Sequence, residues 1–305
     1  MRIGIIGDLH IAPVPEKRLD NYFQTGLNKI EEIASGCDIA IFLGDIFTNV
    51  KVDELFVNPL MRKLKECTVK YGTKFVTIIG NHDVQSEEES NLDGSSLGTL
   101  FSSGAIDIIL PDKPFEADGY RFNTVPVKFK NAKEYIQGKK YEKNDILLVH
   151  HEYETGTNCF SYNDFKDLGM SMVFLGHDHK PIDGGRIVYP EFTIYRSGSI
   201  MRNRGDEYNF TRPLYYYRLE NGVVSCVPVT TIPFDKVFKV ETINKLELQE
   251  RKFTESIDSI IEKYENNITV QNRFSIKSIL EELNAREDII DYIKKQYEKA
   301  GEVFC

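Results

Sequence analysis

All six histidines of this chain lie shortly after brief apolar runs, at points where a β-strand would end. Because the runs are short and rich in β-branched residues, they predict strands that are covered on both faces. The runs are Met1–Ile6, Ile39–Leu43, Phe75–Ile79, Ile146–Val149 and Met172–Leu175. In an open α/β sheet, ligands bind at the carboxyl ends of the strands. A single histidine is more often structural than functional, but six of them confined to strand ends favour one shared site.

Two amphipathic segments separate the first three runs. Leu19–Ala34 and Leu55–Tyr71 carry apolar side chains at helical spacing. This alternation of strand and helix predicts an α/β fold in which helices pack against a largely parallel sheet. After Gly176 the pattern changes to short strands separated by Gly and Asn turns. The strands expected there are Arg186–Tyr189, Phe192–Tyr195, Pro213–Leu219 and Gly222–Val229.

Pro233 marks the expected boundary between two unequal domains. We expect a large domain over residues 1–232 and a small C-terminal extension over residues 233–305. The extension contains two amphipathic stretches, Ser275–Leu283 and Arg286–Tyr297. Helices this short are marginal alone in water, so each needs a surface against which to bury its apolar stripe. That surface is either the first domain of the same chain or a groove on a partner.

The chain is acidic, with 47 acidic and 38 basic residues and a formal net charge of −9. This excess argues against unaided, tight binding to a phosphate backbone. It does not exclude a nuclease, because bound divalent ions would add local positive charge. Two stretches, Lys128–Lys143 and Arg196–Arg212, are locally basic. They are either solvated loop charge or contacts for phosphates.

No apolar run reaches the ~18 residues of a membrane-spanning helix, so no membrane association is expected. The five cysteines are scattered and include no Cys-x-x-Cys pair, which argues against a disulfide framework and against a thiolate zinc site. We therefore expect a cytoplasmic protein, in the host cytoplasm if a phage encodes it.

The histidines have neighbours of the kind that a metal site requires. Carboxylate, amide and imidazole groups gather in five short segments without a thiolate. The segments are Gly7-Asp8-Leu9-His10, Gly44-Asp45, Gly80-Asn81-His82-Asp83, His150-His151 and Gly176-His177-Asp178-His179. This mixture of ligands suits Mn²⁺, Fe or Zn²⁺. Since one tetrahedral ion cannot use so many ligands, we expect two ions that share Asp45, an arrangement suited to attack on phosphorus.

These five segments, in this order, resemble those of the calcineurin-like metallophosphoesterase superfamily. The resemblance implies an α/β fold of the metallophosphoesterase type, a β-sandwich flanked by helices, with a small and mostly helical C-terminal extension. It implies that Asp8, His10 and His179 hold one ion, that Asn81, His150 and His177 hold the other, and that Asp45 bridges them. It also implies that His82 is the general acid. Asp83 would either orient His82 or cap its loop.

Within the superfamily, two segments resemble the SbcD-type nucleases of double-strand-break repair. They are Gly44-Asp45-Ile46-Phe47 and Arg196-Ser197-Gly198-Ser199-Ile200 followed by Arg202. The short length and the helical end look most like the bacteriophage recombination nuclease subunit. Thr48 departs from the pattern, since many cellular members have histidine there. We expect His151, Ser199 and Arg202 to contact the substrate and His150 to be the metal ligand, with the exchange of His150 and His151 left open.

The resemblance therefore predicts a metal-dependent DNA phosphodiesterase, an exonuclease or endonuclease within a recombination or repair complex. We expect two divalent ions, with Mn²⁺ first and Mg²⁺, Fe or Zn²⁺ as alternatives. The implied partners are DNA and a long coiled-coil ABC-type ATPase, which the C-terminal helices would grip; a homodimer is a further option. The alternative function is hydrolysis of small or protein-bound phosphoesters without a nucleic-acid role, which the acidic net charge favours.

Overall fold

The computed structural model describes residues 1–12, 18–84, 92–154, 158–202 and 214–239. The chain divides into two units, Met1–Phe238 and Lys239–Cys305. All elements below belong to the first unit. The two amphipathic stretches expected in the C-terminal extension, Ser275–Leu283 and Arg286–Tyr297, lie outside the described residues. The division into residues 1–232 and 233–305 stays a prediction.

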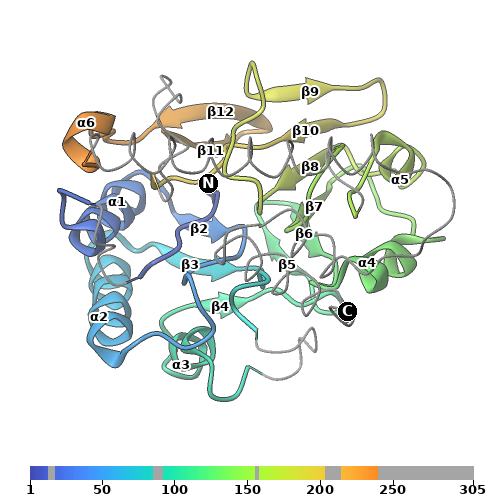
Figure 1. The fold of residues 1–305 in the computed structure, drawn as a ribbon. Coiled ribbons are helices and arrows are strands. Elements are labelled where there is room, and N and C mark those ends of the chain that lie inside the picture. The colour runs from blue at the N-terminus through green and yellow to red at the C-terminus, as the bar shows by residue number, and fades with distance from the viewer. Residues whose placement is uncertain (13–17, 85–91, 155–157, 203–213, 240–305) are drawn as a thin grey trace, which may run out of the picture. The chain divides into compact units, whose positions relative to one another are not determined.

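Two six-stranded sheets form the centre of the first unit (Figure 1), with the strand orders β12-β11-β1-β2-β3-β4 and β5-β6-β7-β8-β10-β9. The first sheet consists of β1 (Arg2–Ile6), β2 (Ile39–Phe42), β3 (Lys74–Thr77), β4 (Asp107–Ile108), β11 (Tyr215–Glu220) and β12 (Val223–Pro228). The second consists of β5 (Phe115–Ala117), β6 (Tyr120–Thr124), β7 (Asp145–Val149), β8 (Met172–Leu175), β9 (Arg186–Val188) and β10 (Thr193–Tyr195). The mixed α/β sandwich expected from the resemblance is confirmed.

The apolar runs divide between the two sheets. Strands β1, β2 and β3 are parallel in the first sheet, where Ile5 pairs with Ile41 and Ile41 with Val76. Strands β7 and β8 are parallel in the second sheet, where Leu148 pairs with Phe174. The alternation of strand and helix in the sequence predicts a largely parallel sheet and does not assign the runs to two sheets, because strands buried on both faces have the same pattern in either sheet.

Helices cover the outer faces of both sheets. They are α1 (Tyr22–Gly36), α2 (Glu54–Tyr71), α3 (Ser96–Ser102), α4 (Phe129–Ile136), α5 (Tyr162–Phe165) and α6 (Phe234–Val237). The predicted helix Leu55–Tyr71 corresponds to α2, which begins after Asp53 and ends before Gly72. The Asp53 side chain accepts the Leu55 N–H as an N-cap, and Gly72 adopts φ 74°, the left-handed conformation that ends many helices.

Three apolar clusters hold these layers together. One lies beneath α1, α2 and α3 and includes Leu27, Leu60 and Leu97. A second joins the two sheets and includes Ile5 and Phe174. The third covers the outer face of the second sheet under α4 and α5. Burial of the middle cluster brings the loops after β1, β2 and β3 next to the loops after β7 and β8. No helix in the part of the chain that the structure describes is both long and apolar enough to cross a membrane.

Lys29 is a cation buried in this fold. It lies in α1, is 4% exposed, and donates from Nζ to the Ile200 carbonyl at 2.6 Å. Burial lowers the pKa of Lys29 to about 8; Glu32 and Asp20 oppose this effect, and Arg202 and Arg18 add to it. Since the charged form is penalised only in the folded state, the folded protein releases the Lys29 proton at a lower pH than the unfolded chain does.

This difference predicts a pH dependence of stability. Between the folded pKa of about 8 and the unfolded value of 10.5, the unfolded chain binds more protons, so the free energy of unfolding should rise with pH. From pH 7 to pH 10 the metal-free protein should gain ~2 kcal/mol relative to its Lys29→Met variant. Urea unfolding of both proteins in chelator at several pH values measures this gain. A constant difference between the two proteins would contradict it.

Candidate metal centre

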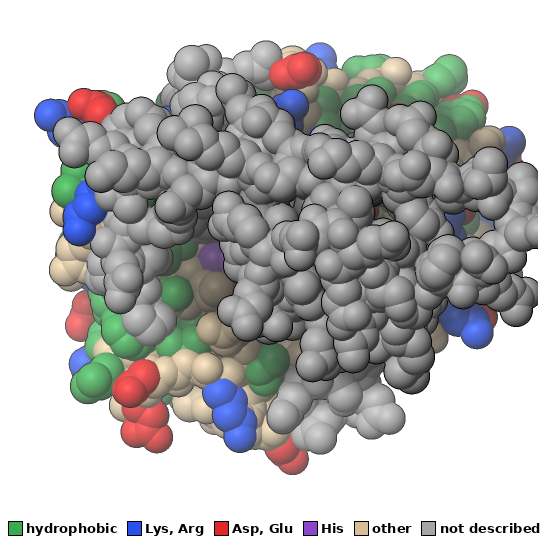
Figure 2. Space-filling view, in the orientation of Figure 1, with side chains coloured by type: hydrophobic (Ala, Val, Ile, Leu, Met, Phe, Trp, Pro, Cys, Tyr) green, Lys and Arg blue, Asp and Glu red, His purple; other side chains and the backbone are tan. Residues whose placement is uncertain are grey.

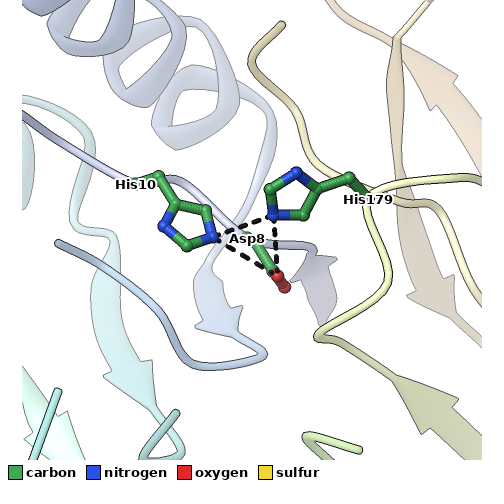
Figure 3. A group of neighbouring side chains, drawn as sticks. All are labelled: Asp8, His10 and His179. Atoms are coloured by element: carbon green, nitrogen blue, oxygen red, sulfur yellow. Dashed lines mark hydrogen bonds and ion pairs between the residues drawn. The ribbon is translucent and has the colours of Figure 1, made fainter. Parts of the chain in front are cut away.

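The first group of facing side chains comes from the loops after β1 and β8 (Figure 3). Asp8, His10 and His179 point toward one another, and the Nε2 atoms of the two histidines are 2.9 Å apart. Each Nε2 lies 3.7 Å from Asp8 Oδ2. Asp8 is 1% exposed. Three ligand atoms from two loops therefore converge on one small volume.

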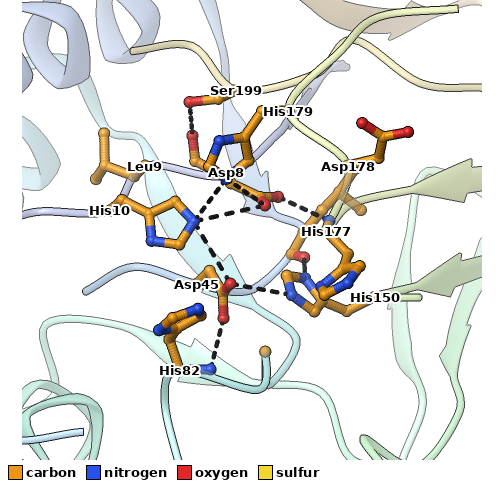
Figure 4. A network of polar contacts seen from close by, with 12 residues as sticks. Asp8, Leu9, His10, Asp45, His82, His150, His177, Asp178, His179 and Ser199 are labelled. Carbon is orange, nitrogen blue, oxygen red and sulfur yellow. Dashed lines mark hydrogen bonds and ion pairs between the residues drawn. The ribbon is translucent and has the colours of Figure 1, made fainter. Parts of the chain in front are cut away.

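The second group comes from the loops after β2, β3, β7 and β8 (Figure 4). Asp45, His150 and His177 offer ligand atoms within 4.8 Å of one another. The Asn81 side-chain oxygen lies with them, 3.1 Å from His150 Nε2 and 3.0 Å from His177 Nδ1. This set matches the four side chains expected at the second position. His177 is one-third exposed, at 33% of its side chain, and histidine surface is visible on the face shown in Figure 2.

The Asp45 carboxylate lies between the two groups. Its Oδ2 is 3.2 Å from His150 Nε2 in the second group and 3.5 Å from His10 Nε2 in the first. Its Oδ1 accepts the backbone N–H of His82 at 2.9 Å. The carboxylate therefore lies near both groups, and its role as the bridge between two ions stays a prediction.

The backbone at these positions is unusual. His10, Asp45 and His177 have φ values of 51°, 48° and 74°, in the left-handed region that side chains with a Cβ rarely adopt. Strained backbone of this kind gathers at functional sites, where the surrounding structure holds it in place. The backbone at Gly80 is also closely packed against the site, because a Cβ there would lie 2.1 Å from Asp45 Oδ1. A glycine is therefore required opposite the shared carboxylate.

A backbone carbonyl fixes which nitrogen of His150 faces the site. His150 Nδ1 lies 2.6 Å from the Leu43 carbonyl. Since a carbonyl only accepts, Nδ1 carries a proton, and Nε2 is left as the nitrogen that faces Asp45 and Asn81. The structure thus places His150, and not His151, beside Asp45 and Asn81; the role of His150 as a metal ligand stays a prediction.

The charges of the site fit divalent cations. Asp8 Oδ2 is buried and has no hydrogen-bond partner among the described residues. Burial raises the pKa of Asp45, but the charge and hydrogen bond of His150 outweigh it and the net shift is downward. Burial alone would lower the pKa of His150, yet Asp45 and Asp8 raise it to about 10. The buried carboxylates of Asp8 and Asp45 thus favour positive charge at this site, and the imidazole nitrogens around them add neutral ligands. This combination suits divalent cations.

His82 lies beside these groups and belongs to neither. Its Nδ1 is 2.6 Å from the Thr48 carbonyl, and its ring packs edge-on against His10 at 5.1 Å. The Thr48 hydroxyl also donates to the His10 carbonyl at 2.9 Å. Thr48, noted in the sequence as a departure from related nucleases, therefore holds the ring of His82 and the backbone of His10. The sequence could not predict the contact with His82, because it is made by the backbone carbonyl of Thr48, which every residue type has.

Asp83 adopts the loop-capping arrangement, one of the two that the sequence allowed. Its Oδ2 accepts the backbone N–H groups of Gly80 and Asp45, each at 2.9 Å. Burial and the nearby Asp45 charge raise the pKa of Asp83 to about 7. The orientation of the His82 ring comes from Thr48 instead.

The three residues expected to contact the substrate are buried inside the fold. His151 is buried, its Nε2 is 2.8 Å from the Pro126 carbonyl, and its ring packs against Phe129 and Phe160. Ser199 is buried and donates to the Asp8 and Met201 carbonyls. Arg202 is buried, and its carbonyl accepts from Arg18. These placements do not fit the expected contacts with substrate. Side chains packed inside the fold support the loops of the site and are not on its surface.

A comparison with protein families identifies the part of the chain that carries these groups. The profile of the calcineurin-like phosphoesterase family matches residues 1–181. The chain belongs to this family. That match spans every residue of the two groups and all the loops that carry them. With family membership and two candidate metal sites in place, the protein is a metal-dependent phosphoesterase, a hydrolase.

Several solved structures resemble the chain at low sequence identity. A dimetal phosphatase from Danio rerio has 12% identity, a TM-score of 0.45, and coverage of 77% of this chain and 99% of its own. A hypothetical protein from Thermus thermophilus has 15% identity, a TM-score of 0.41, and coverage of 74% and 98%. A predicted phosphoesterase from Streptococcus pneumoniae has 13% identity, a TM-score of 0.31, and coverage of 75% and 97%. No curated protein matches the chain at a significant level.

The position of Asp45 predicts the effect of neutralising it. Asp45→Asn should weaken binding of both ions, each by more than ~10²-fold, because the carboxylate that lies between the two groups loses its charge. Asp38→Asn is the matched control, since Asp38 precedes β2 whereas Asp45 follows it. Metal content after dialysis, measured by mass spectrometry, checks the prediction. Two tightly held ions in the Asp45 variant would show that this carboxylate is not shared.

Proposed function

We propose that this phosphoesterase is a two-metal DNA phosphodiesterase, the nuclease subunit of a recombination or repair complex. The observation that carries the proposal is the place of the segment Arg196-Ser197-Gly198-Ser199-Ile200, whose sequence resembles the SbcD-type nucleases. Ser199 Oγ and the Ile200 N–H both bind the Asp8 carbonyl, at 3.0 and 3.2 Å. The Ser199 N–H binds the His179 carbonyl at 3.2 Å. The nuclease-like segment therefore packs against the backbone of the loops that carry Asp8 and His179.

Lysine side chains on and after helix α4 also favour a polyanionic substrate. Helix α4 begins at Phe129, whose ring packs 5.8 Å from the His151 ring, one residue from His150. Lys128 and Lys130 are exposed at the start of this helix, and Lys140 is exposed shortly after its end. These lysines would contact phosphates on either side of the one being cut, which a small phosphoester would not need.

The proposed ligands are Asp8, His10 and His179 for one ion and Asn81, His150 and His177 for the other, with Asp45 shared. Mn²⁺ fits this set of carboxylate, amide and imidazole donors, with Mg²⁺, Fe or Zn²⁺ as alternatives. When bound, a pair of ions activates water for attack on phosphorus and neutralises charge in the transition state.

The protein's own contribution to the leaving group comes from His82. Its Nδ1 donates to the Thr48 carbonyl, so the protonated ring has Nε2–H left to give to the departing sugar oxygen. The Thr48 contact also restricts rotation of the ring, which keeps the donor in place without any action from Asp83. His10 packs on one side of the ring.

His82→Asn should slow turnover by ~10²-fold or more, because the general acid is lost. The ions should stay bound, since the hydrogen bond from residue 82 to Asp45 comes from the backbone N–H. Rates on Mn²⁺-loaded protein, together with metal content, measure both effects. Near-normal turnover, or loss of the ions, would contradict the assignment of the acid.

The nuclease proposal itself is tested with substrates. Wild-type protein loaded with Mn²⁺ or Mg²⁺ should cleave duplexes with recessed 3′ or 5′ ends, with a higher kcat/KM than for a simple phosphodiester. Hydrolysis of small phosphoesters without any cleavage of DNA would instead support the alternative function, which the net charge of −9 favours.

The proposed partner is a long coiled-coil ABC-type ATPase, bound through the stripes Ser275–Leu283 and Arg286–Tyr297. Ile279→Asp should abolish capture of the ATPase, because it places a charge in the first stripe, while metal content stays unchanged. Ser278→Asp adds the same charge outside the apolar stripe of the expected helix and serves as the control. Equal capture by both variants, or loss of metal from the Ile279 variant, would remove these helices as the partner site.

A further inference from the structure

Asp178 stands between two histidines that belong to different metal positions. His177 lies in the group with Asp45, and His179 lies in the group with Asp8. The loop from Gly176 to His179 follows β8, and it therefore has to present both imidazoles at once. The Asp178 carboxylate points away from both groups (Figure 4). It is not a ligand, and its position calls for another explanation.

The loop is held by a residue of the neighbouring strand. Strand β10 pairs in parallel with β8, and Tyr195, its last residue, lies opposite Phe174. Arg196 follows directly, and its Nη1 lies 2.9 Å from Asp178 Oδ2. The two side chains are 12% and 27% exposed. A charge-assisted pair with so little solvent is stronger and more directional than an exposed one.

The remaining contacts of this pair also act on the loop. Asp178 Oδ1 accepts the Lys180 N–H at 3.0 Å, which closes the turn after the second imidazole. The Arg196 carbonyl accepts the Ile182 N–H at 3.0 Å, just beyond the loop. The loop is thus attached to the end of β10 at two points, one through the side chain of Arg196 and one through its backbone.

We infer that Arg196 is a positioning residue that fixes His177 and His179 together through its ion pair with Asp178. The inference rests on the proposed metal ligands. Since His177 has the strained φ of 74°, the loop needs an outside constraint to keep this conformation. Without the ion pair the loop relaxes, and its relaxation moves one imidazole in each metal position. The affinities for both ions therefore fall, although neither Arg196 nor Asp178 touches an ion.

The test measures metal binding to metal-free protein by titration calorimetry with Mn²⁺. In Arg196→Met, both dissociation constants should rise by ~10-fold or more, the usual effect of losing a group that orients metal ligands. Asp178→Asn should do the same, because Oδ1 still accepts the Lys180 N–H and only the charge is lost. The double variant should be no worse than either single one, as expected for partners in one interaction. Arg196→Lys, which keeps the charge, should recover part of the affinity.

The matched control is Arg121→Met, which breaks an ion pair of Arg121 with Asp145 (2.6 Å) at the start of β6 and β7, the other end of the strands from the loops. Its metal affinities should equal those of the wild type. Unchanged affinities in Arg196→Met, a loss confined to one ion, or a loss equal to that of Arg121→Met would overturn the inference. If the wild type takes up two ions and Asp45→Asn does not, such a result leaves the proposed function standing. A wild type that binds no ions would refute both.

Discussion

The metal centre depends on one buried carboxylate. Asp45 Oδ2 lies within 3.5 Å of an imidazole nitrogen in each group, and Oδ1 accepts the N–H of His82. The carboxylate therefore sets the distance between the two positions and the place of the residue proposed as the acid. Its surroundings are built for it, since Gly80 leaves room for its oxygens and Asp83 holds its backbone N–H. Burying such a charge costs free energy unless it is paired, and imidazoles and ions would provide that pairing.

The two sheets contribute different halves of this centre. Asp8, His10, Asp45 and Asn81 follow strands of the first sheet, whereas His150, His177 and His179 follow strands of the second. The ligands meet only while the apolar cluster between the sheets stays packed. Metal binding and folding should therefore be linked, because ions that bind only the assembled site also stabilise the sandwich.

Two residues of the segment that resembles nuclease motifs are packed inside the fold. Ser199 and Arg202 are buried, and Ser199 binds the carbonyl of Asp8. The segment that contains them supports the loops of the centre, and Arg196 at its start reaches the loop of His177 and His179. The basic start of α4 is the better candidate for substrate contact, since Lys128 and Lys130 are exposed there.

The sequence by itself determined the strands after which the ligands come and the identity of the residues that gather. Both can be read from short stretches of sequence, because each apolar run is followed directly by Gly, Asp, Asn or His. The order of the five segments also indicated the family. All seven of the expected ligands lie in the two groups or between them.

Tertiary structure alone decided three other features. It divided the apolar runs between two sheets, because strand periodicity carries no record of which strands pair. It turned His150 inward and His151 into the aromatic core, because the Leu43 and Pro126 carbonyls that hold them come from distant loops. It also placed Thr48 against His82 and Arg196 against Asp178, because contacts between separate strands and loops exist only after the sheets have formed.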